Sequence, residues 1–320
     1  MCIVECIGGL EPAHTYCIQA LQAHKHVVTS NKAMMARFYD ELLETAVKHN
    51  VTIRFSACVG GGIPWLDQLA SVKKTDTIES FYGIMNGTSN YILHQIFMNH
   101  LDFDTALRQA KQLGYAEADP TADIEGFDVA NKVALSANVA WNTMIDINDI
   151  PMCGISTISK DDIDYANNNN YRIRLLGHGI RQGNAVCAYV CPEFIPMDHP
   201  IAHVPLNYNR FECNSAYLGA IRLMGQGAGR YPTAHNVVKD IRLVKSHSTP
   251  FTSIVSRMAV TSANRRFYIR ANDLSGFEPY IETRINDTTI LTKEMDTTTA
   301  FTLYKGIQNK NSCMIGVSLW

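Results

Sequence analysis

Five carboxylates and one lysine lie within the nineteen residues from Gly114 to Lys132, GYAEADPTADIEGFDVANK. The first half contains Pro120 and cannot be regular helix throughout, so it is predicted to be a loop that ends in an N-cap. From about Ile124 the pattern becomes helical, and Asp128 and Lys132, four residues apart, then share one helix face. In isolation such a pair is typical of a surface ion pair worth roughly 0.2 to 0.5 kcal/mol. The order of the residues before it, rather than the pair alone, indicates a chemical site.

Composition favours small-molecule chemistry. The chain has 320 residues, enough for two or three domains, with 46% hydrophobic and 18% charged residues. Its 28 Lys and Arg against 30 Asp and Glu create no broad positive field that would bind nucleic acid or an anionic membrane. We see no apolar run of eighteen residues and no signal peptide, so we expect no membrane span and a cytoplasmic location.

The nine cysteines are scattered and none forms the C-x-x-C spacing of metal or redox motifs. After Cys2 and Cys6, the closest candidate pair in sequence is Cys187 and Cys191. We expect all nine to be reduced and most of them to be buried.

Strands and helices alternate in the first hundred residues, which predicts an α/β fold with a parallel sheet. Helices are expected at 11–23, 32–49 and 89–99, and strands at the opening CIVECIGG, at HVVTSN, and at 51–57 and 76–85. A nucleotide-binding half of this type normally begins with a strand and a G-x-G-x-x-G turn, which this sequence lacks.

Five further motifs occur in order: VECIGGLEP at 4–12, HVVTSNKA at 26–33, VGGGIP at 59–64, NGTSNYIL at 86–93 and GAGRYPTA at 227–234. Together with the acidic segment they resemble homoserine dehydrogenase, over residues 1 to about 245. That family reduces aspartate semialdehyde to homoserine with NADP or NAD, in the biosynthesis of threonine, methionine and isoleucine. The resemblance also implies a homodimer.

The resemblance implies that the chain starts inside a partial Rossmann-type nucleotide-binding domain, after the first strand and the phosphate loop. We expect the rest of that domain at 1–50, an α+β catalytic and dimerisation domain at 51–223, and a return helix at 224–245. The tail, 246–320, contains RFYIRANDLSGF at 266–277, which faintly resembles the start of an ACT regulatory domain. A partial, degenerate ACT-like tail is expected there.

By the same resemblance, Lys132 is the proton donor to the developing alkoxide and Asp128 orients it. Lys32, after the end of a strand, is similar to the family lysine that lies near the nicotinamide and the substrate. Taken alone, Lys32 would be an ordinary lysine at a helix start, which is the unfavourable end of the helix dipole.

Glu117 and Asp123 resemble the acidic residues that bind the substrate's amino group and side-chain oxygen, and Tyr115 of the same loop is assigned to the substrate site. Without the resemblance, the two carboxylates are typical of a loop or an N-cap.

Gly87 and Thr88 begin a predicted helix, where backbone amides and a hydroxyl would take the substrate carboxylate; the alternative is a plain capped helix. Ile7, Gly8 and Gly227 resemble positions that contact the cofactor, although each glycine could serve only a tight turn.

The VGGGIP segment resembles a loop whose main-chain oxygens hold a structural monovalent cation, Na⁺ or K⁺. The ligands would be carbonyl oxygens of Ser56, Val59, Gly61 and Ile63. The family usually has glutamate at the position of Ser56, but a carbonyl ligand depends little on the side chain.

Two functions remain open from the sequence. One is a homoserine dehydrogenase whose missing first segment reflects a truncated gene product or gene model. The other is a non-catalytic truncated paralogue that acts as a binding or dimerisation partner. The enzyme is favoured because the proposed acid Lys132, its partner Asp128 and the two substrate-binding carboxylates are all present. A chain that had lost its catalytic role would be expected to lack some of them.

Overall fold

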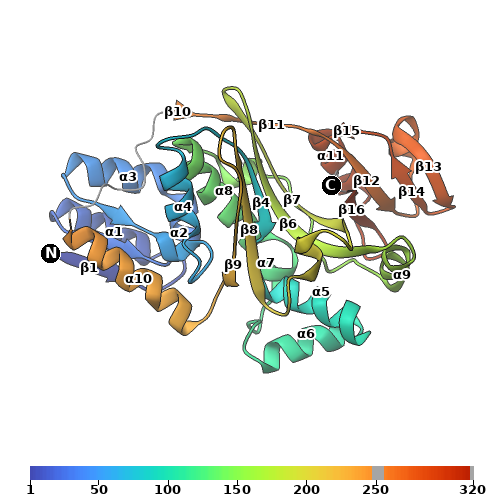
Figure 1. The fold of residues 1–320 in the computed structure, drawn as a ribbon, viewed down its shortest axis with the longest axis horizontal. Helices are drawn as coiled ribbons and strands as arrows, with labels where there is room; N and C mark the ends of the chain where they lie inside the picture. Colours follow the sequence, from blue (N-terminus) through green and yellow to red (C-terminus); the bar gives the residue numbers. More distant parts are fainter. Residues whose placement is uncertain (247–255, 318–320) are drawn as a thin grey trace.

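The computed structural model describes residues 1–246 and 256–317. Its three parts follow one another along the longest axis of the molecule: a first α/β part, a central sheet with helices, and a C-terminal part (Figure 1). Residues 247–255 and 318–320 of the predicted tail lie outside this description.

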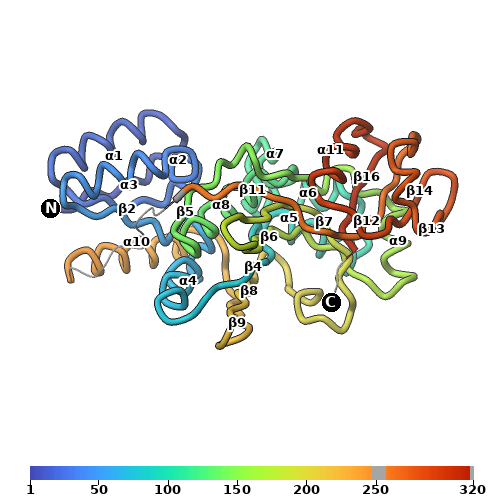
Figure 2. The backbone as a smooth tube through the Cα atoms, turned by 90° about the horizontal axis from the view of Figure 1, so that it is seen from above, coloured from blue at the N-terminus to red at the C-terminus, as the bar shows by residue number. Residues whose placement is uncertain are grey.

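The first part is a parallel sheet of β1 (Cys2–Glu5), β2 (His26–Thr29) and β3 (Ile53–Arg54), in that order. On β2, Val27 and Val28 point to opposite faces because side chains alternate along a strand. Val27 packs into the core that includes α1 (Ala13–Gln22) and α3 (Tyr39–Lys48). Val28 packs against α10 (Arg230–Lys245), and Figure 2 shows α1 and α3 above the strands and α10 below them. The predicted parallel α/β sheet is confirmed.

Three details of the first part differ from the sequence-based expectation. The helix expected at 32–49 is two helices, α2 (Lys32–Arg37) and α3, because the chain bends at Phe38, whose ring stacks on His14 with centroids 3.9 Å apart. The strand expected at 51–57 shortens to β3 and continues as a 3-10 turn, η1 (Ser56–Cys58). A domain boundary at residue 50 would also separate β3 from the sheet to which it is hydrogen-bonded.

One long mixed sheet runs through the central and C-terminal parts in the order β13-β14-β12-β16-β7-β6-β4-β8-β9. Its central strands are β4 (Ile78–Ile84), β6 (Tyr171–Gln182), β7 (Ala185–Pro196), β8 (Tyr208–Ser215) and β9 (Gly219–Gln226). The predicted strands at YRIRLLGHGI and AVCAYVCPEF form the β6 and β7 hairpin, which pairs over its full length.

Helices of the central part cover this sheet and carry the acidic segment. They are α4 (Trp65–Val72), α5 (Gly87–Asn99), α6 (Phe103–Gln112), α7 (Thr121–Ile124), α8 (Phe127–Trp141) and α9 (Lys160–Asn168). Between α8 and α9 lie β5 (Thr143–Met144) and η2 (Ile147–Asp149), and η3 (Pro200–His203) connects β7 to β8. Helix α8 lies directly on β6, and the glycine at position 177 permits this close approach. A Cβ atom at Gly177 would lie only 2.5 Å from the Val133 side chain and 2.7 Å from the Val129 side chain. Helix α8 is buried along most of its length, and its buried residues include Asp128 and Lys132.

The C-terminal part has the strand order of a split βαβ fold. It contains β10 (Ser256–Arg257), β11 (Ala259–Thr261), β12 (Asn264–Arg270), β13 (Ile281–Asn286), β14 (Thr289–Thr292), β15 (Met295–Asp296), α11 (Thr297–Ile307) and β16 (Cys313–Val317). A 3-10 segment, η4 (Ser275–Tyr280), stands where such a fold has its first helix. The order β13-β14-β12-β16 therefore fits a partial ACT-like tail.

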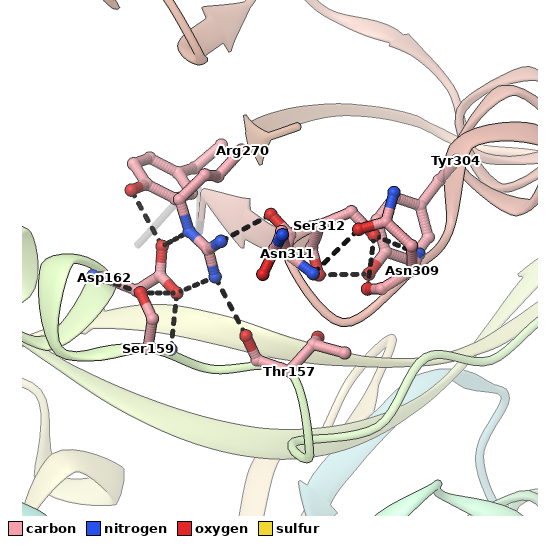
Figure 3. A network of polar contacts seen from close by, with 9 residues as sticks. Thr157, Ser159, Asp162, Arg270, Tyr304, Asn309, Asn311 and Ser312 are labelled. Carbon is pink, nitrogen blue, oxygen red and sulfur yellow. Dashed lines mark hydrogen bonds and ion pairs between the residues drawn. The ribbon is translucent and has the colours of Figure 1, made fainter. Parts of the chain in front are cut away.

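A buried ion pair joins this part to α9 (Figure 3). Arg270 of β12 binds both oxygens of Asp162, at 2.8 Å each, and donates to the carbonyl oxygens of Thr157 and Asn311. The Tyr268 hydroxyl donates to the same carboxylate at 2.9 Å. Asp162 is fully buried, so the pair anchors the C-terminal part to the central one.

All nine cysteines are free and seven are buried, as expected. The pair in contact is Cys153 and Cys191, with sulfur atoms 3.2 Å apart, rather than Cys187 and Cys191.

Among the residues that the structure describes, no helix is long and apolar enough to cross a membrane.

Candidate active site

A cavity of about 420 Å³ lies where the carboxyl end of β2 meets α5, α8 and the loop after β9. Ligands of α/β proteins bind at the carboxyl ends of parallel strands. Ten of the predicted site residues line this cavity: Lys32, Gly61, Gly87, Thr88, Tyr115, Glu117, Asp123, Asp128, Lys132 and Gly227. The fold therefore brings together segments that are up to two hundred residues apart.

Asp128 and Lys132 form a buried pair on the first turns of α8. Lys132 Nζ lies 2.6 Å from Asp128 Oδ2 and donates a second hydrogen bond, also 2.6 Å, to the carbonyl oxygen of Met85. Both side chains are at least nine-tenths buried. The pair is therefore no surface ion pair, and two of the three N–H groups of the ammonium are engaged by protein oxygens.

Lys32 approaches the same carboxylate from the first part of the chain. Its Nζ lies 3.1 Å from Asp128 Oδ1, while its side chain stays 41% exposed. The Asp128 charge raises the pKa of Lys32, against the opposing effect of burial. Asn31 caps the helix that Lys32 begins by accepting from the backbone N–H of Met34.

The two ammonium groups determine the charge of Asp128. Burial alone would raise the pKa of this carboxyl, but Lys132, Lys32 and hydrogen bonds from Lys132 and Asn86 outweigh it. They hold the pKa of Asp128 well below its usual range. Asp128 therefore stays ionised and keeps the Lys132 ammonium in position.

Asn86 is a site residue that the sequence analysis missed. Its Nδ2 donates to Asp123 Oδ1 at 2.7 Å and to Asp128 Oδ2 at 2.8 Å, while its Oδ1 accepts from Ser89 N and caps α5. An asparagine directly before a predicted helix is an N-cap signal that could have identified it. Asn209 was missed as well; it donates to the Met85 carbonyl oxygen at 2.9 Å, from a strand more than a hundred residues away.

The start of α5 forms one wall of the cavity. The Thr88 hydroxyl donates to the Tyr115 carbonyl oxygen at 2.5 Å, so this hydroxyl hydrogen is already engaged. The backbone N–H groups of Gly87 and Thr88, rather than the hydroxyl, are then the groups suited to a carboxylate. Tyr91 is buried and packs edge-on against Tyr115, so it belongs to the core and not to the polar wall of the cavity.

The two acidic residues of the preceding loop differ in environment. Glu117 lies exposed at the cavity mouth. Asp123 is half-buried; burial raises its pKa, and the negative charge of Asp128 raises it further. Asp123 and Glu117 together give the cavity a region that would attract an ammonium group.

Ile7 and Gly8 are not brought into this cavity. They follow β1 at the same edge of the parallel sheet, and their backbone N–H groups donate to Glu5 Oε1 at 2.6 and 3.3 Å. The Ile7 side chain is 58% exposed. Their assignment to the cofactor stays a prediction.

The loop expected to hold a cation makes other contacts. The Asn236 amide nitrogen donates to the carbonyl oxygens of Gly61 and Ile63, two of the four expected ligands. Ser56 is fixed through its N–H and its hydroxyl, both of which donate to Asp240. A cation shared by four carbonyl oxygens does not fit an arrangement in which an amide N–H group faces two of them.

The fold and the site have the architecture of nicotinamide-dependent dehydrogenases that join a Rossmann-type sheet to a separate substrate domain. The sequence profile described as "Homoserine dehydrogenase, NAD binding domain" matches residues 1–56, and the profile "Homoserine dehydrogenase" matches residues 64–242. The homoserine dehydrogenase of Synechocystis is 41% identical over 243 residues, which cover 75% of this chain and 56% of that protein. The chain belongs to the homoserine dehydrogenase family.

Solved structures agree with this assignment. A homoserine dehydrogenase from Thiobacillus denitrificans superposes with a TM-score of 0.86 at 30% identity, covering 99% of this chain and 82% of that one. A hyperthermophilic archaeal homoserine dehydrogenase in complex with NADPH gives a TM-score of 0.67 at 27% identity, covering 78% of this chain and 72% of that one. The chain spans little more than half the length of the curated relative from Synechocystis.

Proposed function

We propose that this chain interconverts L-aspartate 4-semialdehyde and L-homoserine with NADPH or NADH. The observation that carries the proposal is the buried Lys132 ammonium, held by Asp128 at the cavity between the two domains. Its third N–H group is left for a substrate oxygen, because the other two donate to Asp128 and to Met85.

The protein's part in the reaction is to bind, to orient and to move one proton. Lys132 Nζ gives its proton to the oxygen of the substrate carbonyl as that oxygen gains negative charge, and Asp128 fixes the ammonium. Glu117 and Asp123 bind the amino group and the side-chain oxygen of the substrate, and the N–H groups at the start of α5 bind its carboxylate.

The cavity residues fit the nicotinamide end of a dinucleotide. Gly227, Ala228 and Gly229 form a wall with little side-chain bulk, and Lys32 lies at the carboxyl end of β2 beside it. When bound, the nicotinamide supplies the hydride. A relative with NADPH bound supports this cofactor, and we also infer a homodimer and a cytoplasmic location from the family resemblance.

Fluorescence titration of the purified chain with NADPH, followed by addition of aspartate semialdehyde in the same cuvette, tests the proposal. Binding followed by loss of NADPH absorbance at 340 nm would support it. A folded chain that binds NADPH without turnover, or does not bind it, would contradict it and favour the non-catalytic paralogue. Circular dichroism on the same sample establishes that the chain is folded.

A further inference from the structure

Helix α10 holds the loop from residue 55 to residue 63 with two buried side chains one helical turn apart. Asn236, 1% exposed, donates through Nδ2 to the carbonyl oxygens of Gly61 and, at 3.4 Å, of Ile63. Asp240, fully buried, accepts from the N–H of Ser56 at 2.9 Å and from its hydroxyl at 2.8 Å. Residues four apart lie on the same helix face, so one face of α10 fixes both ends of the loop.

The chemistry of the neighbours decides which end of the amide faces the loop. Carbonyl oxygens only accept hydrogen bonds, so the Asn236 nitrogen, with its two N–H groups, must point toward Gly61 and Ile63. The amide thus brings partial positive charge to two converging carbonyl oxygens in the interior. A bound monovalent cation would bring positive charge to the same two oxygens.

We propose that the Asn236 amide takes the place of a structural monovalent cation, so that this loop folds without bound Na⁺ or K⁺. The Ile63 carbonyl oxygen also accepts from the Trp65 N–H at 2.8 Å, so the cost of an unpaired buried oxygen falls mainly on the Gly61 carbonyl. Either a cation or an N–H donor removes that cost. Both would not fit together, because the N–H groups point at the oxygens that the cation would need. The inference concerns the fold of the loop and does not rest on the proposed activity.

Thermal unfolding in different chloride salts tests this proposal. The melting temperature of the wild-type chain should be the same in NaCl, KCl and choline chloride at equal ionic strength. Asn236→Ala should melt about 2 to 6 °C lower in choline chloride, and NaCl or KCl should restore part of the loss in a saturable way. Asn236→Asp places a carboxylate against the carbonyl oxygens and should depend on the cation more strongly.

Asn90 offers a matched control. It is also a buried asparagine whose amide donates to main-chain carbonyl oxygens, those of Val204, Leu206 and Tyr208. Arg174 donates to the Val204 carbonyl oxygen and to Asn90 Oδ1, so its positive charge would repel a cation there. Asn90→Ala should therefore lose stability without rescue by Na⁺ or K⁺.

Saturable stabilisation of the wild-type chain by Na⁺ or K⁺, absent in choline chloride, would overturn the proposal. So would an Asn236→Ala chain that is as stable as the wild type in choline chloride and unaffected by either cation. The wild-type titration decides the first point even if Asn236→Ala and Asn236→Asp do not fold.

Discussion

Lys32 Nζ lies 3.1 Å from Asp128 Oδ1, and this ion pair crosses from the first α/β part of the chain to the central part. Lys32 begins a helix of the first domain, whereas Asp128 lies in the first turn of the helix that packs on the central sheet. Through this contact, the position of the first domain is coupled to the carboxylate that orients Lys132. A shift of one domain relative to the other would change the charge environment of the proposed acid.

Replacing Lys132 by Met should lower kcat by about 10² to 10⁴-fold, because the proton donor is lost while the side-chain volume is kept. The dissociation constant for NADPH should change little. Lys73→Met is a matched control, since the ammonium of Lys73 likewise donates to protein oxygens, Val139 O and Asn142 Oδ1. Lys73 is part-buried, at the far end of α8 and outside the cavity. Steady-state kinetics measure kcat for both variants. A Lys132→Met chain with the wild-type kcat would show that Lys132 is not the proton donor.

Replacing Asp128 by Asn should lower the free energy of unfolding at pH 7 by roughly 3 kcal/mol, because two ammonium groups lose their common carboxylate. The folded state holds the pKa of Asp128 below its unfolded value. Its contribution is therefore full above the unfolded pKa of about 4 and is lost as the pH falls through the folded pKa. Urea unfolding should show that the difference in free energy of unfolding between the wild type and Asp128→Asn is constant from about pH 7 to 5 and smaller below about pH 4. If the stability difference stayed the same below about pH 4, loss of the ion pair would not be its cause.

Asp123→Asn should have the opposite effect on stability. Burial and Asp128 raise the pKa of Asp123 in the folded state, so ionisation of Asp123 costs stability as the pH rises above its unfolded pKa. The variant should therefore be more stable than the wild type at pH 7 and should show no gain below about pH 4. The same change removes a charge for the substrate ammonium, so KM for aspartate semialdehyde should rise. Urea unfolding of Asp123→Asn is measured alongside Asp128→Asn. If Asp123→Asn were less stable than the wild type at pH 7, ionised Asp123 would not be destabilising.

Arg270→Ala should lower the free energy of unfolding by about 3 to 5 kcal/mol, because it leaves the buried Asp162 carboxylate without its bidentate partner. Arg284→Ala is the control, since its ion pair with Glu278 lies at the surface and should be worth about 0 to 1 kcal/mol. Limited proteolysis should release fragments from the C-terminal part only in the Arg270 variant. Equal stability of the two variants would show that the network in Figure 3 does not anchor this part.

The sequence by itself determined the local features of this protein. The spacing of Asp128 and Lys132 placed them on one helix face, and the alternation of apolar runs predicted the parallel sheet, because helix and strand periods are properties of neighbouring residues. The ordered motifs predicted the family. The sequence did not predict where the expected helix at 32–49 divides into two. The bend at Phe38 depends on packing against His14, which lies far from it in the sequence.

Only the tertiary structure decided which groups meet. The contacts of Lys32 with Asp128, of Asn209 with the Met85 carbonyl oxygen and of Asn236 with the Gly61 carbonyl oxygen join residues about a hundred or more positions apart. Burial of Asp128 among Lys32, Lys132 and Asn86 likewise comes from the fold. This burial is what distinguishes the Asp128 and Lys132 pair from a surface ion pair with the same spacing. Such contacts depend on how distant segments pack, and no local pattern encodes them.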